Sequence, residues 1–270
     1  MLKVGTIILL LMTAFGCSDH GNVSSDFLVR SVTVDGKEYR YRVLLPKKRD
    51  PNKKVPVMLF LHGSGALGDD NTAQIDGFRW AIEALKDNVD FIAVLPQCKP
   101  DSFWAANDMA EYALTALDAS VIEFNGDSQR LYLAGFSLGG YGVWQIAAAN
   151  PGKFAALMPV AGGVVGERPI APADRAAIIP EVGTMLDSPE PYKAVATAIG
   201  QTPVWVFHGD KDESVPVDFS RQIVQALKDN GSKNVKYTEY ANDGHMIINK
   251  AFSEPRLIEW LGQQKLSSGK

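Results

Sequence analysis

The sequence has few of the residues that build metal centres and disulfide frameworks. It holds only two cysteines, Cys17 and Cys98, and four histidines in 270 residues. It has no HExxH motif, no paired cysteines and no acidic loop with EF-hand spacing. A net charge of −4 argues against a nucleic-acid-binding surface, which needs clustered lysine and arginine. We therefore expect no metal, no other cofactor and no nucleic-acid partner.

Positive charge gathers in one place only, the segment 47–54. It contains five basic residues, Lys47, Lys48, Arg49, Lys53 and Lys54. The simplest interpretation is a solvated loop between a hairpin and the next strand. The alternative, for a membrane-tethered protein, is contact with anionic lipid headgroups.

The most informative motif is a serine between two glycines, Gly135-Phe-Ser137-Leu-Gly139. It follows the apolar run 130–134 and precedes a helix-compatible stretch, 140–149. This context is typical of a nucleophile elbow, a strand-to-helix turn so sharp that side chains at the flanking positions would collide with the neighbouring elements. The alternative is a tight turn that carries serine by chance. Because the apolar strand before the motif fits the elbow, we predict that Ser137 is a nucleophile.

A serine nucleophile needs a base, and the base needs an orienting carboxylate. Of the four histidines, His20 lies in a polar stretch near the N-terminus, and His62 and His208 each end an apolar run. We interpret His62 and His208 as structural residues that brace loop backbone. His245 lies in a polar turn downstream of a carboxylate-containing loop, 208–216, and is therefore the predicted base.

The order serine, carboxylate, histidine along the chain is that of the α/β-hydrolases. The stretch His208-Gly-x-x-Asp212-x-x-Val-Pro resembles the acid loop of bacterial α/β-hydrolase esterases, and Gly244-His245 resembles their histidine loop. This resemblance implies that Asp212 is the acid of the triad. Asp210 and Asp243 are the alternatives, which we interpret as solvated loop carboxylates.

The same resemblance implies an oxyanion hole built from two backbone N–H groups. One belongs to Leu138, directly after the nucleophile, and the other to Ser64, in the loop that follows an early strand. Pro96-Gln97-Cys98, followed by Trp104, also resembles a group of secreted bacterial esterases. That group includes carboxylesterases, phospholipase-like hydrolases, polyhydroxybutyrate depolymerase-like proteins and predicted peptidases. The resemblance covers about residues 30–262 and implies that Gln97 and Trp104 contact the substrate.

Strand-like and helix-like segments alternate, which predicts a single α/β-hydrolase domain over residues 27–264, with a mostly parallel central sheet and helices on both faces. Asp35-Gly36 predicts a hairpin turn between strands 27–34 and 38–45. Continuous apolar runs predict parallel strands at 55–61 and 91–95, and helical periodicity predicts helices at 109–124, 217–228 and 254–261. The proline-rich stretch 163–202 is expected to leave this pattern. It is either a small lid or part of the substrate wall, or else a surface loop packed on its own side chains.

The N-terminus resembles a bacterial lipoprotein signal. Residues 1–17 combine a short basic start, an apolar run too short to span a membrane and a lipobox-like Ala-Phe-Gly-Cys17. The resemblance implies that Cys17 is lipidated, that residues 18–26 form a polar tether and that the protein is anchored by lipid in the cell envelope. Ser18, the residue after the cysteine, resembles a signal for sorting to the outer membrane. The alternative is an ordinary signal peptide and a periplasmic or secreted protein.

These features together predict a serine esterase that cleaves carboxylic esters, of short-chain or carbohydrate-linked acyl groups, through an acyl-enzyme. Two alternatives stay open. The first is a serine peptidase, which uses the same triad. Peptidases of this fold generally add a large second domain, and the segment before the first strand has too few residues to form one. The second is a surface binding protein that has kept the fold and lost activity.

Overall fold

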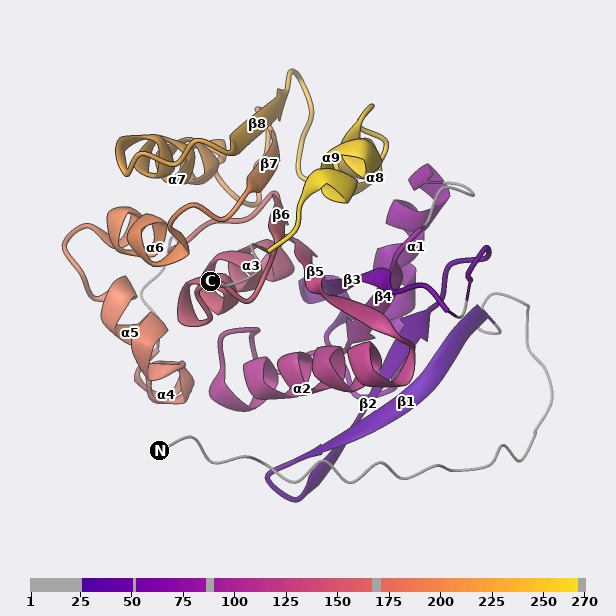
Figure 1. The fold of residues 1–270 in the computed structure, drawn as a ribbon. Helices are drawn as coiled ribbons and strands as arrows, with labels where there is room; N and C mark the ends of the chain where they lie inside the picture. The colour runs from indigo at the N-terminus through magenta and orange to yellow at the C-terminus, as the bar shows by residue number, and fades with distance from the viewer. Residues whose placement is uncertain (1–25, 51, 86–89, 167–170, 267–270) are drawn as a thin grey trace.

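Residues 26–50, 52–85, 90–166 and 171–266 are described by the computed structural model, which shows a twisted central sheet with helices on both faces (Figure 1). The predicted signal segment 1–17, with Cys17, and residues 18–25 of the predicted tether lie outside the described residues. The predicted α/β-hydrolase architecture, with its mostly parallel sheet, is confirmed.

The sheet has eight strands in the order β1-β2-β4-β3-β5-β6-β7-β8. Their bounds are β1 (Phe27–Val34), β2 (Lys37–Leu44), β3 (Val55–Leu61), β4 (Ile92–Pro96), β5 (Gly126–Phe136), β6 (Ala156–Val160), β7 (Val204–Gly209) and β8 (Val235–Tyr240). Strands β3 to β8 pair in parallel, whereas β1 and β2 form an antiparallel hairpin that joins the edge of β4. Asp35 and Gly36 both have positive φ, at 47° and 75°, as the predicted hairpin turn requires.

The helices are α1 (Ala73–Leu85), α2 (Asn107–Glu123), α3 (Leu138–Ala149), α4 (Pro172–Ala177), α5 (Pro180–Leu186), α6 (Pro191–Ile199), α7 (Val217–Asp229), α8 (Ile248–Phe252) and α9 (Leu257–Gln263). The helices predicted at 109–124 and 217–228 are confirmed within two residues. The last helix begins at Leu257 rather than at 254, because Arg256 adopts a left-handed conformation (φ 73°) that no α-helix continues. Within the described ranges, no helix is long and apolar enough to cross a bilayer.

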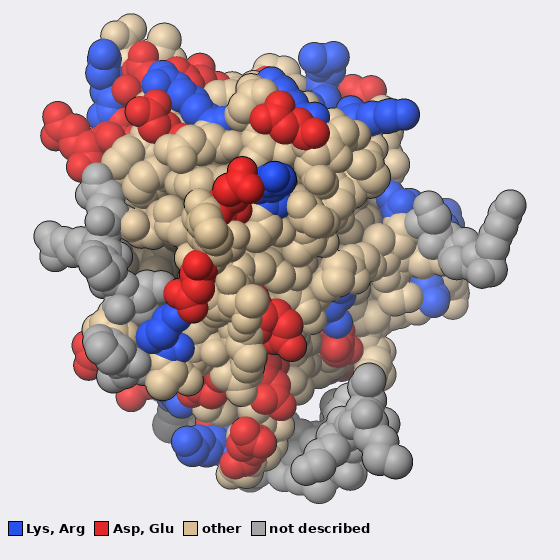
Figure 2. All heavy atoms as spheres, turned by 90° about the vertical axis from the view of Figure 1, so that its left-hand side faces the viewer, with Lys and Arg blue, Asp and Glu red and all other residues tan. Residues whose placement is uncertain are grey.

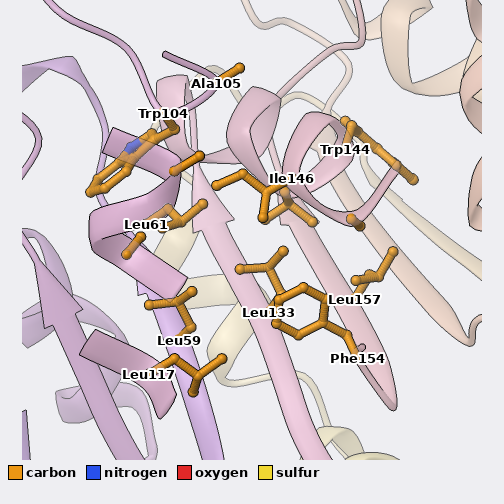
Figure 3. Close-up of a cluster of buried hydrophobic side chains, with 14 of the residues drawn as sticks. Leu59, Leu61, Trp104, Ala105, Leu117, Leu133, Trp144, Ile146, Phe154 and Leu157 are labelled. Atoms are coloured by element: carbon orange, nitrogen blue, oxygen red, sulfur yellow. The ribbon is translucent and has the colours of Figure 1, made fainter. Parts of the chain in front are cut away.

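Alternate residues of the parallel strands supply two hydrophobic cores. Leu59, Leu133 and Leu157 face α2, α3 and α7 in one core, which also contains the large buried side chains of Trp104 and Trp144 (Figure 3). Met58, Phe60 and the other alternating residues face α1, α8 and α9 in the second core. A strand that is buried on both faces explains why these segments read as continuous apolar runs.

The proline-rich stretch forms three short helices, α4, α5 and α6, and each of them has a proline in its first turn. Proline lacks an N–H, and at this position an α-helix needs none. Ile178, Val182, Val195 and other apolar side chains of the stretch are buried in the first core. The stretch is therefore not a surface loop packed on its own side chains. The helices α5 and α6 pack against α3, and α6 also packs against α7. On this side of the molecule, acidic and basic side chains are interspersed with uncharged surface (Figure 2).

Candidate active site

Ser137 lies in the turn between β5 and α3. Its φ of 55° and ψ of −117° are unusual for a residue with a side chain. Such a conformation costs about 1–3 kcal/mol and persists only where the surrounding structure imposes it. Two backbone hydrogen bonds hold the turn, from the Ser137 N–H to the Val160 carbonyl (2.9 Å) and from the Tyr141 N–H to the Ser137 carbonyl (3.1 Å). This is the geometry that the sequence motif predicts for a nucleophile elbow.

The two glycines of the motif lie where backbones meet. A Cβ atom at Gly135 would collide with the carbonyl of Gly139, and a Cβ atom at Gly139 would collide with the carbonyl of Leu61 at the end of β3. Neither obstacle is a flexible side chain that could move aside. The first turn of α3 therefore reaches the end of β3 only if these positions carry glycine.

The structure brings together the three residues predicted to form the triad, which come from three loops at the carboxyl edge of the sheet. His245, after β8, places Nε2 2.9 Å from the Ser137 hydroxyl oxygen and Nδ1 2.7 Å from Asp212 Oδ2, after β7. An ionised carboxylate only accepts hydrogen bonds, so Nδ1 carries the proton and Nε2 is left to accept from the serine. The imidazole, 18% exposed, also contacts the Phe136 ring at a centroid distance of 4.9 Å.

The side chain of Asp212 is fully buried, and every described partner of its carboxylate is a hydrogen-bond donor. The backbone N–H groups of Ser214 and Val215 donate to Oδ1 at 2.8 Å each, and His208 Nε2 lies 3.1 Å from Oδ2. Burial alone would raise the pKa of Asp212, but the hydrogen bonds from His208, His245 and the two amides outweigh it and hold the pKa well below its usual range. The carboxyl is therefore ionised at neutral pH.

The two alternative carboxylates have other partners. Asp210 accepts a hydrogen bond from the Asn242 N–H at 2.7 Å, and Asp243 forms an ion pair with Lys250 at 2.5 Å. Both of these contacts fix the shape of the loops on either side of His245. Of the three candidate acids, Asp212 is thus the one that contacts the imidazole.

The predicted oxyanion loop lies against the nucleophile. A Cβ atom built on Gly63 would lie 3.3 Å from the Cβ of Ser137, so the peptide that leads into Ser64 passes directly beside the serine. Ser64 begins a short 3₁₀ turn, and Leu138 begins α3. In the described part of the chain, neither N–H group donates to another residue. Two unpaired amides beside a serine can stabilise a developing negative charge on a substrate carbonyl.

His62 fixes the start of this loop, as predicted for a structural histidine. Its Nδ1 donates to the Gly63 carbonyl at 2.7 Å, and its Nε2 accepts from the Cys98 N–H at 2.9 Å, which defines a neutral ring with the proton on Nδ1. Burial lowers the pKa of His62 to about 4. The Trp104 indole donates to the His62 carbonyl at 2.9 Å and packs edge-on against the imidazole.

Gln97 and Trp104, which the resemblance placed in contact with substrate, are both buried in this structure. The Gln97 amide accepts from the Asn71 N–H (2.6 Å) and donates to Asp70 (2.9 Å) and to the Ala66 carbonyl (3.2 Å). Both side chains hold the oxyanion loop from behind, so we correct their role from substrate contact to support. Both residues belong to the segment that follows β4, Gln97 directly after the strand and Trp104 further along, and β4 lies beside β3 in the sheet, which explains why they reach this loop.

Two features near the triad were not anticipated from the sequence. The first is that His208 donates a hydrogen bond to the carboxylate of Asp212. The spacing in His208-Gly-x-x-Asp212 could have indicated this contact, since the two residues are four apart around a tight turn. Met246, next to His245, is 65% exposed, which places an apolar side chain at the rim of the site.

The thiol of Cys98 is buried, and burial raises its pKa to about 12, so it is not a nucleophile at neutral pH.

The buried neutral ring of His62 predicts a pH dependence of stability. The unfolded chain binds a proton at this position below about pH 6.5 whereas the folded chain does not, so the free energy of unfolding should fall on acidification by up to about 1.4 kcal/mol per pH unit. The fall should occur between the ordinary histidine pKa of 6.5 and the folded value of about 4. Urea unfolding at several pH values in this range, on the wild type and His62→Gln, measures it. An equally steep slope in the variant would show that another group causes the acid sensitivity.

Comparison with protein families assigns the chain to a known group. The family model of the prolyl oligopeptidase family matches residues 104–263, more than half of the chain, and includes the positions of all three triad residues. Outside this match lie β3 and the oxyanion loop with Ser64.

Individual relatives include both peptidases and esterases. The chain is 30% identical over 145 residues to dipeptidyl-peptidase 5 of Porphyromonas gingivalis, an alignment that covers 48% of this chain and 20% of that protein. It is also 30% identical over 123 residues to a bifunctional acetylxylan esterase/xylanase of Neocallimastix patriciarum, with coverage of 44% and 17%. The chain thus spans a fifth or less of the length of these two relatives.

Among solved structures, the crystal structure of a thermostable esterase superposes with a TM-score of 0.71 and 28% sequence identity, covering 89% of this chain and 63% of that one. The fold, the arrangement of serine, histidine and aspartate and the family match agree with one another. The chain belongs to the prolyl oligopeptidase family and is a serine hydrolase of the α/β-hydrolase fold.

Proposed function

We propose that the protein is a carboxylic ester hydrolase that works through an acyl-enzyme on Ser137. The observation that carries the proposal is the continuous hydrogen-bonded series from the Ser137 hydroxyl through His245 to Asp212, with heavy-atom distances of 2.9 and 2.7 Å. Each group already lies within the distance that proton transfer requires. This series also argues against a silent binding protein, which has no need to keep it.

The reaction follows from the positions of these groups. As the Ser137 oxygen attacks the ester carbonyl carbon, its proton passes to His245 Nε2, and the carbonyl oxygen becomes an oxyanion that accepts hydrogen bonds from the Leu138 and Ser64 N–H groups. The tetrahedral intermediate collapses, the bond to the alcohol oxygen breaks, and His245 returns the proton to the departing alcohol. Water then attacks the acyl-enzyme by the same steps and releases the acid. Asp212 stabilises the imidazolium in both halves of the reaction.

The surroundings of the triad support an ester as substrate. Met246 exposes an apolar side chain beside His245, which suits a short acyl group or its alcohol. Both the acetylxylan esterase relative and the thermostable esterase structure are named for ester cleavage. The second candidate is a serine peptidase, favoured by the 30% identity to dipeptidyl-peptidase 5. Amide cleavage is more demanding, because the amine must be protonated as it leaves and the peptide must be held in register.

The assignment of the acid predicts a ranking of two neighbouring variants. Asp212→Asn should lower kcat by about 10³- to 10⁴-fold, because the amide no longer favours the imidazole tautomer with the proton on Nδ1. Asp210→Asn, the matched control, changes a carboxylate that accepts a hydrogen bond from the Asn242 backbone rather than from His245, and it should lower kcat by less than about ten-fold. Ester hydrolysis and circular dichroism of both variants provide the measurement. A larger loss of activity in a folded Asp210→Asn protein would move the acid to Asp210.

The choice between ester and peptide predicts a substrate preference. For short acyl esters of p-nitrophenol, kcat/KM should exceed that for aminoacyl and dipeptidyl p-nitroanilides by at least about 10³-fold, since productive orientation of an extended peptide is worth several orders of magnitude in rate. Both substrate classes release chromophores that absorb visible light, so one instrument compares them directly. Ser137→Ala gives the background rate for each.

A value of kcat/KM on any of these anilides equal to that on the best ester would replace the esterase proposal by the peptidase. Activity on neither class, with Ser137 unreactive toward a fluorophosphonate, would favour the binding protein instead.

A further inference from the structure

The structure contains a cavity at the amino edge of the sheet, the edge opposite the triad. Its volume is about 320 Å³, and it lies where β3 and β5 begin and where the chain approaches β4. The loop 46–54, which carries the basic cluster, forms one wall, and α9 forms another. Lining residues include Lys48, Arg49, Asp50, Lys53, Lys54, Asp90, Phe91, Arg130, Ile258 and Leu261.

The cavity is positively charged although the protein as a whole is acidic. Five basic residues line it against two carboxylates, in a chain whose net charge is −4. Lys53 lies 3.9 Å from Asp50, and Arg130 is bound to Asp127 at 2.8 Å. Among the described residues, the ammonium groups of Lys48 and Lys54 pair with no carboxylate, and both side chains are exposed. Exposed basic groups concentrated around a hollow attract anions.

The position of this surface relates it to the start of the chain. Phe27, the first residue of β1, pairs with Leu44, three residues before Lys47. Leu44 in turn pairs with Ala93 near the beginning of β4, which places this end of the hairpin at the amino edge. The segment 1–25 therefore joins the domain beside the basic cluster. If Cys17 is lipidated as the sequence predicts, the polar tether is short and holds this edge close to the bilayer.

We propose that the basic amino-edge surface, formed by Lys48, Arg49, Lys53, Lys54 and Arg130, binds the headgroups of an anionic phospholipid bilayer. Juxtamembrane basic clusters are attracted to anionic leaflets, and each basic residue near the surface increases partitioning roughly five-fold. The hollow is large enough to admit a headgroup phosphate, and Phe91, Ile258 and Leu261 supply apolar contacts beneath it. Docking by this edge leaves Ser137, at the opposite edge, facing away from the membrane and open to substrates in solution.

Co-sedimentation with vesicles tests this proposal independently of the hydrolase activity. The full chain carrying Cys17→Ser, which cannot be lipidated, is mixed with vesicles of phosphatidylcholine and phosphatidylglycerol or of phosphatidylcholine alone, at about 0.1 M salt. We expect the protein to bind the mixed vesicles and to bind them less as the salt concentration is raised. Combining Lys48→Gln, Lys53→Gln and Lys54→Gln should weaken partitioning onto the mixed vesicles roughly 100-fold. The matched control combines Lys37→Gln, Lys193→Gln and Lys228→Gln, three exposed lysines outside the cavity, and should bind like the parent.

Ester hydrolysis should be the same in both triple variants, which shows that they fold. Equal binding to the two kinds of vesicle, or equal loss in the two triple variants, would overturn the proposal. The last measurement is the Tm of the parent and of the cavity variant (Lys48→Gln, Lys53→Gln and Lys54→Gln combined) with and without inorganic phosphate. A rise in the Tm of the parent that the cavity variant lacks, without any vesicle binding, would assign the cavity to a small soluble anion and would overturn the bilayer as its partner.

Discussion

The close approach of the first turn of α3 to the end of β3 is the constraint on which the rest of the site depends. It requires glycine at position 139, against the Leu61 carbonyl, and it holds Ser137 at a φ of 55°. The same approach places the loop after β3 beside the serine, so that nucleophile and oxyanion donors are positioned by one contact. His62, Gln97 and Trp104 then hold that loop through buried hydrogen bonds, which fix these polar groups in a single arrangement.

The acid shows how a buried charge is maintained. The side chain of Asp212 has no exposed surface, yet three kinds of donor satisfy its oxygens, namely backbone amides, His245 and the fully buried His208. A buried carboxylate without such partners would take up a proton and could no longer orient His245. The donors from His208 and the turn fix the carboxylate before substrate arrives, and this pre-organisation is what electrostatic catalysis requires.

The sequence was sufficient for strands β1 to β5, the nucleophile elbow and the triad because each has a local signal: apolar runs, flanking glycines and the order of serine, aspartate and histidine. It was insufficient where the structure depends on contacts between distant segments. The prolines of the 163–202 stretch left two alternatives open, a lid or substrate wall and a surface loop, whereas in the structure Pro172, Pro180 and Pro191 begin helices whose apolar sides join the core. Gln97 and Trp104 were placed near substrate, and only the pairing of β3 with β4 shows that they support the oxyanion loop from behind. The basic segment was visible in the sequence, whereas the hollow beside α9 was not.

The central claim is that the turn after β5 presents Ser137 as the reactive nucleophile of this hydrolase. Covalent labelling with a fluorophosphonate, followed by mass spectrometry of the proteolytic fragments, tests it most directly. A single adduct on the fragment with Ser137, absent from a folded Ser137→Ala protein, is the predicted result. An adduct on Ser64 or another serine, or labelling that persists in Ser137→Ala, would contradict it.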